Sequence, residues 1–121
     1  MYCVKVLYPN SPGSSFNLEH YLKVHVPLGL GLLQKHCGVV PIRIEAAAKP
    51  YALVAGARPP YHMIFSAYFR TRDEAESFKK LFGVEEAVRL QKEDWPNFSQ
   101  SDPEIMITEI VEIDPATRLP K

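Results

Sequence analysis

Hydrophobic and polar side chains alternate with a period of two in four segments of the chain. In the first segment, Tyr2, Val4, Val6 and Tyr8 share one face, and the residues between them share the other. Such alternation is typical of β-strands, in which successive side chains point to opposite faces. We therefore predict strands over residues 2–8, 39–47, 61–70 and 105–113.

Between the first two predicted strands the hydrophobic period lengthens to three and four residues, which indicates an amphipathic helix over residues 17–36. Asn17 is a suitable N-cap for this helix, and Gly38 is a suitable C-terminal stop. Pro27 lies inside the helix. Because proline has no N–H and its ring clashes with the preceding turn, we expect the helix to kink or restart near Val26.

Two more helical segments are predicted after the third strand. The first covers residues 73–82 and is capped by Thr71 or Asp73, and the second covers residues 85–94. In the first, the spacing of three and four residues should turn inward Ala75, Phe78 and Phe82. The order of elements is then β-α-β-β-α-β. With right-handed crossovers this order predicts a ferredoxin-like α+β fold, a four-stranded antiparallel sheet with helices on one face.

Both faces of the first and last predicted strands carry apolar side chains. In the last segment Ile105 and Ile107 face one way, and Met106 and Ile110 face the other. Because a sheet that is apolar on both faces cannot leave one face in water, we expect a second copy of the chain to cover it, as a homodimer whose two sheets form a barrel. The domain is predicted over residues 1–113, with a frayed tail over residues 114–121.

Composition narrows the class of protein. The 121 residues suffice for one domain, and 46% of them are hydrophobic. Lys+Arg and Asp+Glu both number 14, and this balance argues against nucleic acid or an anionic membrane as the partner. No apolar run approaches the ~20 residues that span a bilayer, and no signal peptide is evident. Cys3 and Cys37 do not form a disulfide framework, so a cytoplasmic location is expected.

Two motifs resemble a known family. Residues 16–28, FNLEHYLKVHVPL, are similar to the signature of the EthD family, and residues 94–98, DWPNF, resemble its second motif. The family pattern is carried by Phe16, Tyr21, His25, Pro27, Leu28, Asp94, Asn97 and Phe98. The chain departs from it at His20, where an aromatic residue is common, and at Val24. The resemblance implies a dimeric α/β barrel, in a superfamily with cyclases, isomerases, monooxygenases and decarboxylases that need no metal or bound cofactor.

His25 is the leading candidate for chemistry. It follows Tyr21 by four residues, so both project from one helix face toward the sheet. An imidazole suits proton transfer near neutral pH. In one interpretation His25 is the acid or base for a carbonyl-bearing substrate whose oxygen is held by Tyr21 or Tyr68. In the other, His25 is a buried structural residue bonded to a main-chain carbonyl or to Asp94.

The remaining candidates are assigned more loosely. Asp94 either orients His25 or binds a loop amide. Asn97 either stabilises its turn, which is the favoured interpretation, or contacts substrate. Substrate binding is assigned to Phe16, His62, Tyr68 and Phe98, and in the second interpretation also to Asn97.

No metal or cofactor site is predicted. His20 and His25 are five residues apart, which in an α-helix places them on different faces. The chain also lacks HExxH, CxxC and a glycine-rich phosphate loop.

Three functions remain open at this point. The first is a small cofactor-independent enzyme of cyclase, isomerase or decarboxylase type, acting on an aromatic or polyketide-like carbonyl compound. Its apolar pocket would be lined by Tyr21, Leu32, Phe65, Tyr68 and Phe69. The alternative is a non-catalytic protein that holds a hydrophobic small molecule for a partner enzyme. The third is an accessory subunit without a ligand.

Overall fold

The computed structural model describes all residues from 1 to 121. The strands are β1 (Tyr2–Pro9), β2 (Arg43–Ala48), β3 (Tyr61–Phe69) and β4 (Glu104–Glu109). The α-helices are α1 (Leu18–His20), α2 (Val26–Cys37), α3 (Arg72–Lys80) and α4 (Glu85–Asp94). Three short helical turns lie between these elements: η1 (Tyr21–His25), a π-helix, and the 3₁₀ turns η2 (Leu81–Gly83) and η3 (Trp95–Asn97).

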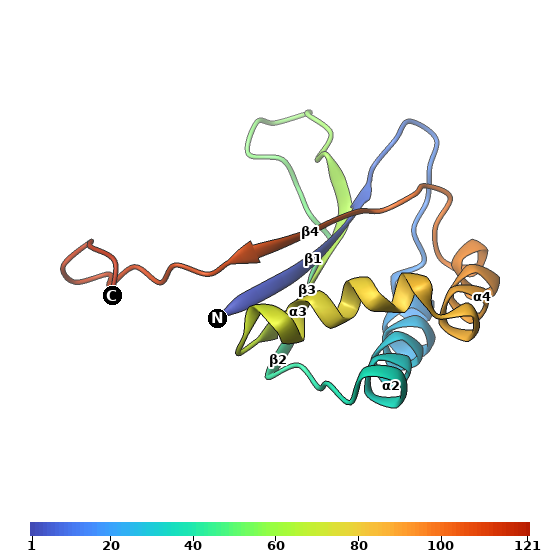
Figure 1. The fold of residues 1–121 in the computed structure, drawn as a ribbon. Helices are drawn as coiled ribbons and strands as arrows, with labels where there is room; N and C mark the ends of the chain where they lie inside the picture. Colours follow the sequence, from blue (N-terminus) through green and yellow to red (C-terminus); the bar gives the residue numbers. More distant parts are fainter.

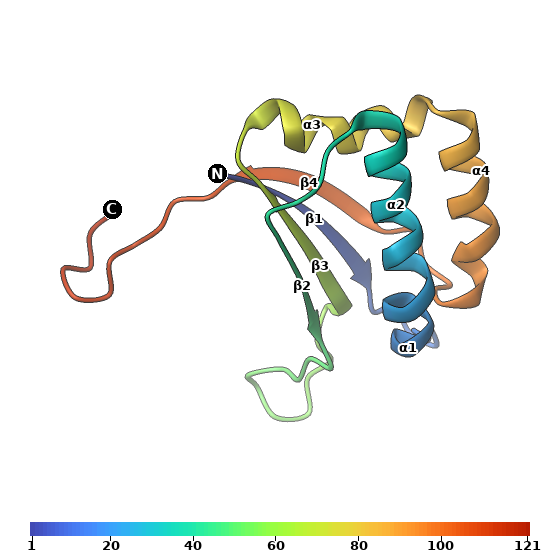
Figure 2. The same cartoon turned by 90° about the horizontal axis from the view of Figure 1, so that it is seen from below.

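The four strands form one antiparallel sheet in the order β2-β3-β1-β4. The helices lie on one face of this sheet, and its other face carries none (Figures 1 and 2). The core lies between the two layers, where side chains of β1 and β3 such as Val4, Met63 and Phe69 are fully buried. This arrangement confirms the predicted ferredoxin-like α+β fold. No helix is both long enough and apolar enough to span a membrane.

The predicted helix boundaries are confirmed by the caps. The Asn17 side chain accepts a hydrogen bond from the His20 N–H at 3.1 Å, and Thr71 accepts one from the Glu74 N–H at 3.1 Å. Gly38 ends α2 with φ 66°, a left-handed conformation that favours glycine. The first helix also restarts at Val26, next to Pro27, as expected.

The backbone just before Pro27 forms a π-turn. The Val26 N–H donates to the Tyr21 carbonyl, five residues earlier, instead of four as in an α-helix. Pro27 has no N–H to offer the Lys23 carbonyl, so the regular α-helical bonding is interrupted at this place in any case. Each turn of a π-helix takes more residues than an α-turn, and this changes which side chains share a face.

Three local predictions are wrong. β2 begins at Arg43, not at residue 39, because it pairs only with β3, and Arg43 lies opposite Tyr68, near the end of that strand. β4 ends at Glu109, not at residue 113, because Glu109 pairs with Tyr2 and β1 begins there. Phe82 is 57% exposed and does not turn into the core, because the helix tightens into η2 at Leu81.

Residues beyond β4 extend away from the body of the molecule (Figure 1). They fold back on themselves and are not frayed: the Asp114 N–H donates to the Leu119 carbonyl at 2.9 Å, and Ile113 forms a bridge with Pro120. This short arm exposes Val111, Ile113 and Leu119.

Candidate functional site

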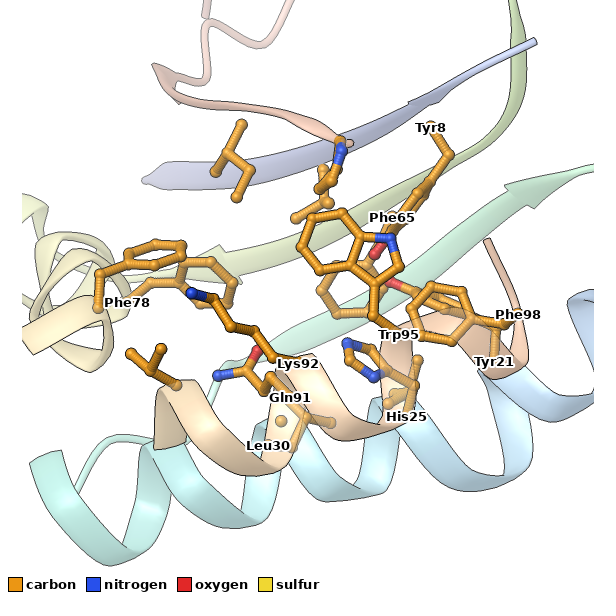
Figure 3. Close-up of a pocket in the computed structure, with 17 residues that line it drawn as sticks. Tyr8, Tyr21, His25, Leu30, Phe65, Phe78, Gln91, Lys92, Trp95 and Phe98 are labelled. Carbon is orange, nitrogen blue, oxygen red and sulfur yellow. The ribbon is translucent and has the colours of Figure 1, made fainter. Parts of the chain in front are cut away.

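A cavity of about 120 Å³ lies between the helices and the sheet face that they cover. Its wall is mostly apolar and aromatic, and it is built from the strands β1, β3 and β4 and from every helical segment except α1 (Figure 3). The lining residues are Val6, Tyr8, Tyr21, His25, Val26, Gly29, Leu30, Phe65, Phe78, Phe82, Val88, Gln91, Lys92, Trp95, Phe98, Pro103 and Ile105.

His25 lies at the end of the π-turn η1 and is held by Asp94, the last residue of α4. The two side chains meet at 3.0 Å, from His25 Nδ1 to Asp94 Oδ2, and both are largely buried. An ionised carboxylate only accepts hydrogen bonds, so Nδ1 carries the hydrogen and Nε2 carries the lone pair. Nε2 forms no hydrogen bond within the chain and is not sealed from solvent, which leaves it free for a ligand in the cavity.

His20 binds the same carboxylate, at 2.7 Å from its Nε2 to Asp94 Oδ1. The sequence-based expectation that His20 and His25 lie on different helix faces is therefore wrong. It assumed α-helical geometry, whereas the intervening π-turn adds a residue to the turn and brings positions five apart to one side. The result is an imidazole–carboxylate–imidazole row that runs from the cavity wall to the partly exposed His20.

Electrostatics in this row favour an ionised Asp94 and a neutral His25. Burial alone would raise the pKa of Asp94, but hydrogen bonds from His20, Asn97 and His25 outweigh it and hold the pKa below its usual value. For His25, burial lowers the pKa, and the hydrogen bond and charge of Asp94 offset only part of that effect. The neutral imidazole with its lone pair on Nε2 is therefore the form present at neutral pH.

Aromatic rings surround His25 on the cavity side. Phe98 lies 4.4 Å from it between ring centroids, and Tyr21 stacks on it at 5.5 Å. Tyr8, which sequence reasoning did not assign to the site, meets Tyr21 edge-on at 5.3 Å. Figure 3 shows the rings of Tyr8 and Tyr21 converging at the same end of the cavity as His25.

Both tyrosines keep their protons. Burial raises the pKa of Tyr8 to about 12. Burial first, and then the neighbouring Tyr8, raise the pKa of Tyr21 well above its ordinary value. Two protonated hydroxyls, which interact with each other, therefore lie within the apolar wall.

Tyr68 does not line this cavity, which corrects the expectation that it shares a pocket with Tyr21. Side chains alternate along β3, so Phe65 faces the helices and Tyr68 faces the opposite side of the sheet. There its hydroxyl donates to Glu45, and Arg43 lies over its ring at 5.7 Å. Leu32 and Phe69, also expected in the pocket, are buried in the core without lining the cavity.

Phe16 and His62 lie together at a second pocket on the surface. Their rings stack at 6.0 Å, and His62 Nε2 lies 2.8 Å from the Ser14 hydroxyl. Both residues line a separate, more polar pocket with Lys49 and other residues of the loop before β3. The ring centroid of Phe16 lies 5.0 Å from that of Tyr8, so Phe16 packs against a residue of the main cavity wall.

Asn97 supports Asp94 instead of contacting the cavity. Its side-chain N–H donates to Asp94 Oδ1 at 3.3 Å. Neither of the two interpretations of its sequence position, a turn stabilised through its own backbone or a substrate contact, describes this bond. The polar atoms of His20, His25, Asn97 and Asp94 are directed at one another, and no group of three or more His, Cys, Asp or Glu side chains is arranged to hold a metal ion.

Sequence reasoning missed most of the lining residues, and four of them lie on the continuous helical stretch of α4 and η3. Val88, Gln91, Lys92 and Trp95 recur at steps of three, one and three and therefore share one helix face, which lines the cavity. That periodicity is visible in the sequence, but the mixture of polar and apolar side chains on the face concealed its role. His20 carried a weaker signal, its five-residue spacing from His25 just before a proline.

Comparison with known proteins agrees with this fold. An EthD-like protein from Ralstonia eutropha JMP134 has a TM-score of 0.73 at 18% identity, covering 95% of this chain and 96% of its own. An ethyl tert-butyl ether D (EthD) family protein from Bacillus halodurans C-125 has a TM-score of 0.57 at 15% identity, covering 91% and 98%. No family model and no curated protein matches the sequence. The chain has the ferredoxin-like fold of these EthD-like structures, which supports the resemblance found in its motifs.

Proposed function

We propose that the protein is a small cofactor-independent enzyme of cyclase, isomerase or decarboxylase type, acting on an aromatic or polyketide-like carbonyl compound with His25 as general acid and base. One observation carries the proposal: Asp94 holds His25 by Nδ1, which leaves Nε2 free at the wall of an apolar cavity. A buried carboxylate that orients an imidazole in this way is a recurrent arrangement for proton transfer.

The chemistry follows from the positions of three groups. The lone pair on His25 Nε2 takes a proton from the carbon next to the substrate carbonyl, and the C–H electrons move toward the carbonyl oxygen. The resulting enolate oxygen accepts a hydrogen bond from the Tyr21 hydroxyl, which stays protonated. Asp94 stabilises the imidazolium, which in an isomerisation returns the proton to another carbon. In a cyclisation the enolate carbon attacks a second carbonyl carbon of the same molecule, and the imidazolium protonates the alkoxide that forms. His25 then removes the second proton from the attacking carbon and passes it to the hydroxyl, which leaves as water as the C=C bond forms.

The proposal is tested by proton exchange with a simple probe. Phenylacetone in D₂O is followed by NMR, and we expect the protein to accelerate replacement of the protons next to the carbonyl by deuterium. Because His25 acts as a base and burial lowers its pKa below 6.5, the rate should be constant near neutral pH and fall as the pH drops through that lowered value.

Binding of the probe without any exchange would contradict catalysis and would favour the alternative, a protein that holds a hydrophobic molecule for a partner enzyme. If the probe neither binds nor exchanges, the accessory subunit without a ligand becomes the better account. Calorimetric titration of the same probe separates these two outcomes.

We also propose that the chain is a homodimer. The sheet face without helices carries the exposed Met106 and the half-buried Ile64, and the C-terminal arm exposes apolar side chains beyond β4. A second copy is the simplest cover for both surfaces. Analytical ultracentrifugation at micromolar concentration is expected to give twice the chain mass, and a monomeric mass would overturn this part of the proposal.

A further inference from the structure

The polar groups that line the cavity are separated into two ends. His25 lies at one end with Phe98 and the two tyrosines, whereas Gln91 and Lys92 reach from α4 toward Phe78 at the other (Figure 3). Solvent reaches the Phe78 end, where Phe82, whose ring centroid lies 6.2 Å from that of Phe78, is 57% exposed.

Lys92 is the one positively charged side chain in the cavity wall; the residue is exposed, and three acids near it in the sequence have other partners. On α4, Glu86 binds Lys35 at 2.7 Å and Glu93 lies 3.4 Å from Arg89. Asp94 is bound by His20 and His25. Lys92 itself forms no ion pair within the chain.

We infer that the ligand carries a carboxylate, which binds Lys92 and Gln91 while its carbonyl end lies at His25. This inference rests on the proposed function in taking the cavity as the ligand site. One ammonium beside one amide donor matches a monoanion with two acceptor oxygens, whereas a dianionic phosphate would call for more positive charge.

The size of the cavity limits what lies between the two ends. A volume of about 120 Å³ is close to that of cavities that hold one aromatic ring, such as an engineered cavity of roughly 150 Å³ that binds benzene. The favoured ligand is therefore a single aromatic ring with a reactive carbonyl side chain on one side and a carboxylate on the other.

A matched pair of probes tests the carboxylate directly. The compounds are 4-(2-oxopropyl)benzoate and its carboxamide, which have nearly the same shape and differ in charge. Calorimetric titration of the whole protein should show that the carboxylate binds about tenfold more tightly, in line with a charge-assisted hydrogen bond. Lys92→Gln should remove this preference and leave binding of the carboxamide unchanged, and Lys92→Arg should retain most of it.

Lys79→Gln is the control, because it removes the same charge from the neighbouring helix α3, from an exposed side chain outside the cavity wall. We expect this variant to keep the tenfold preference. Equal affinity of the wild type for both probes would overturn the inference, as would equal losses in the Lys92→Gln and Lys79→Gln variants. The proposed function fails separately, when the carboxylate binds preferentially but its protons next to the carbonyl do not exchange.

Discussion

His25 and His62 are two histidines in similar aromatic surroundings that differ in what holds the imidazole. Each lies near a phenylalanine, Phe98 or Phe16, and burial is the main cause that lowers the pKa of each. His25, however, donates to a carboxylate that is itself held by two more side chains, whereas His62 has a serine hydroxyl, which either donates or accepts.

This difference decides which imidazole suits catalysis. Asp94 fixes the tautomer of His25 and stabilises its protonated form, so its free nitrogen has a defined role. Ser14 leaves both tautomers of His62 available, and the positive charge of Arg58 adds to the lowering of its pKa. Burial and aromatic neighbours alone therefore do not make a general base, because orientation and charge come from the partner.

Removal of each imidazole is expected to give the largest contrast. His25→Ala should lower the rate of phenylacetone proton exchange by about 10² to 10⁴-fold, the range typical of general acid–base catalysis. His62→Ala should leave the rate within about twofold of wild type, since His62 lies outside the main cavity. Unchanged exchange in a folded His25→Ala variant, with folding checked by circular dichroism, would refute the assigned role.

Removal of each partner should give a smaller contrast. Asp94→Asn keeps the shape but loses the negative charge, so we expect about a 10 to 100-fold lower exchange rate. It should also move the pH step further down, because Asp94 partly offsets the effect of burial on the pKa of His25. Ser14→Ala should change neither quantity, and an equal response of the two variants would remove the distinction between the sites.

The tyrosines extend the comparison to the two faces of the sheet. Tyr21→Phe removes a hydroxyl donor from the cavity wall and should slow exchange by about tenfold. Tyr68→Phe removes a hydroxyl from the opposite face, where its partner is Glu45, and should leave the rate unchanged. Initial rates at saturating probe separate this effect from weaker binding. A rate that depends on Tyr68 would mean that the substrate binds on the sheet face opposite to the one we propose.

The smallest expected effect concerns stability. The pKa of His25 is lower in the folded protein than in the unfolded chain, so the unfolded chain binds the proton more readily. The free energy of unfolding should therefore decrease as the pH falls below about 6.5, and the loss is complete below the folded-state pKa. Urea titrations between neutral and mildly acidic pH should show a shallower decrease for His25→Gln, and parallel curves would contradict the direction of the shift.

Much of the fold was determined by local features of the sequence. Alternation over Tyr2 to Tyr8, the cap at Asn17 and the restart at Val26 depend on neighbours within a few residues, so they could be predicted without a structure. The ends of strands could not be predicted in this way, because they depend on the partner strand. β4 ends at Glu109 because Tyr2, which lies opposite it, is the first residue of β1.

The site followed the same division. The sequence by itself determined that His25 and Tyr21 face inward together, since a four-residue spacing sets their side of the helix. It also brought Asp94 into consideration through its motif. Tertiary structure alone decided that Asp94 joins His25 to His20, because that bond crosses between two helices and depends on a π-turn whose extra residue realigns the helix face. It also decided that Tyr68 lies on the other side of the sheet, because the pleat direction of β3 is set by which face the helices cover.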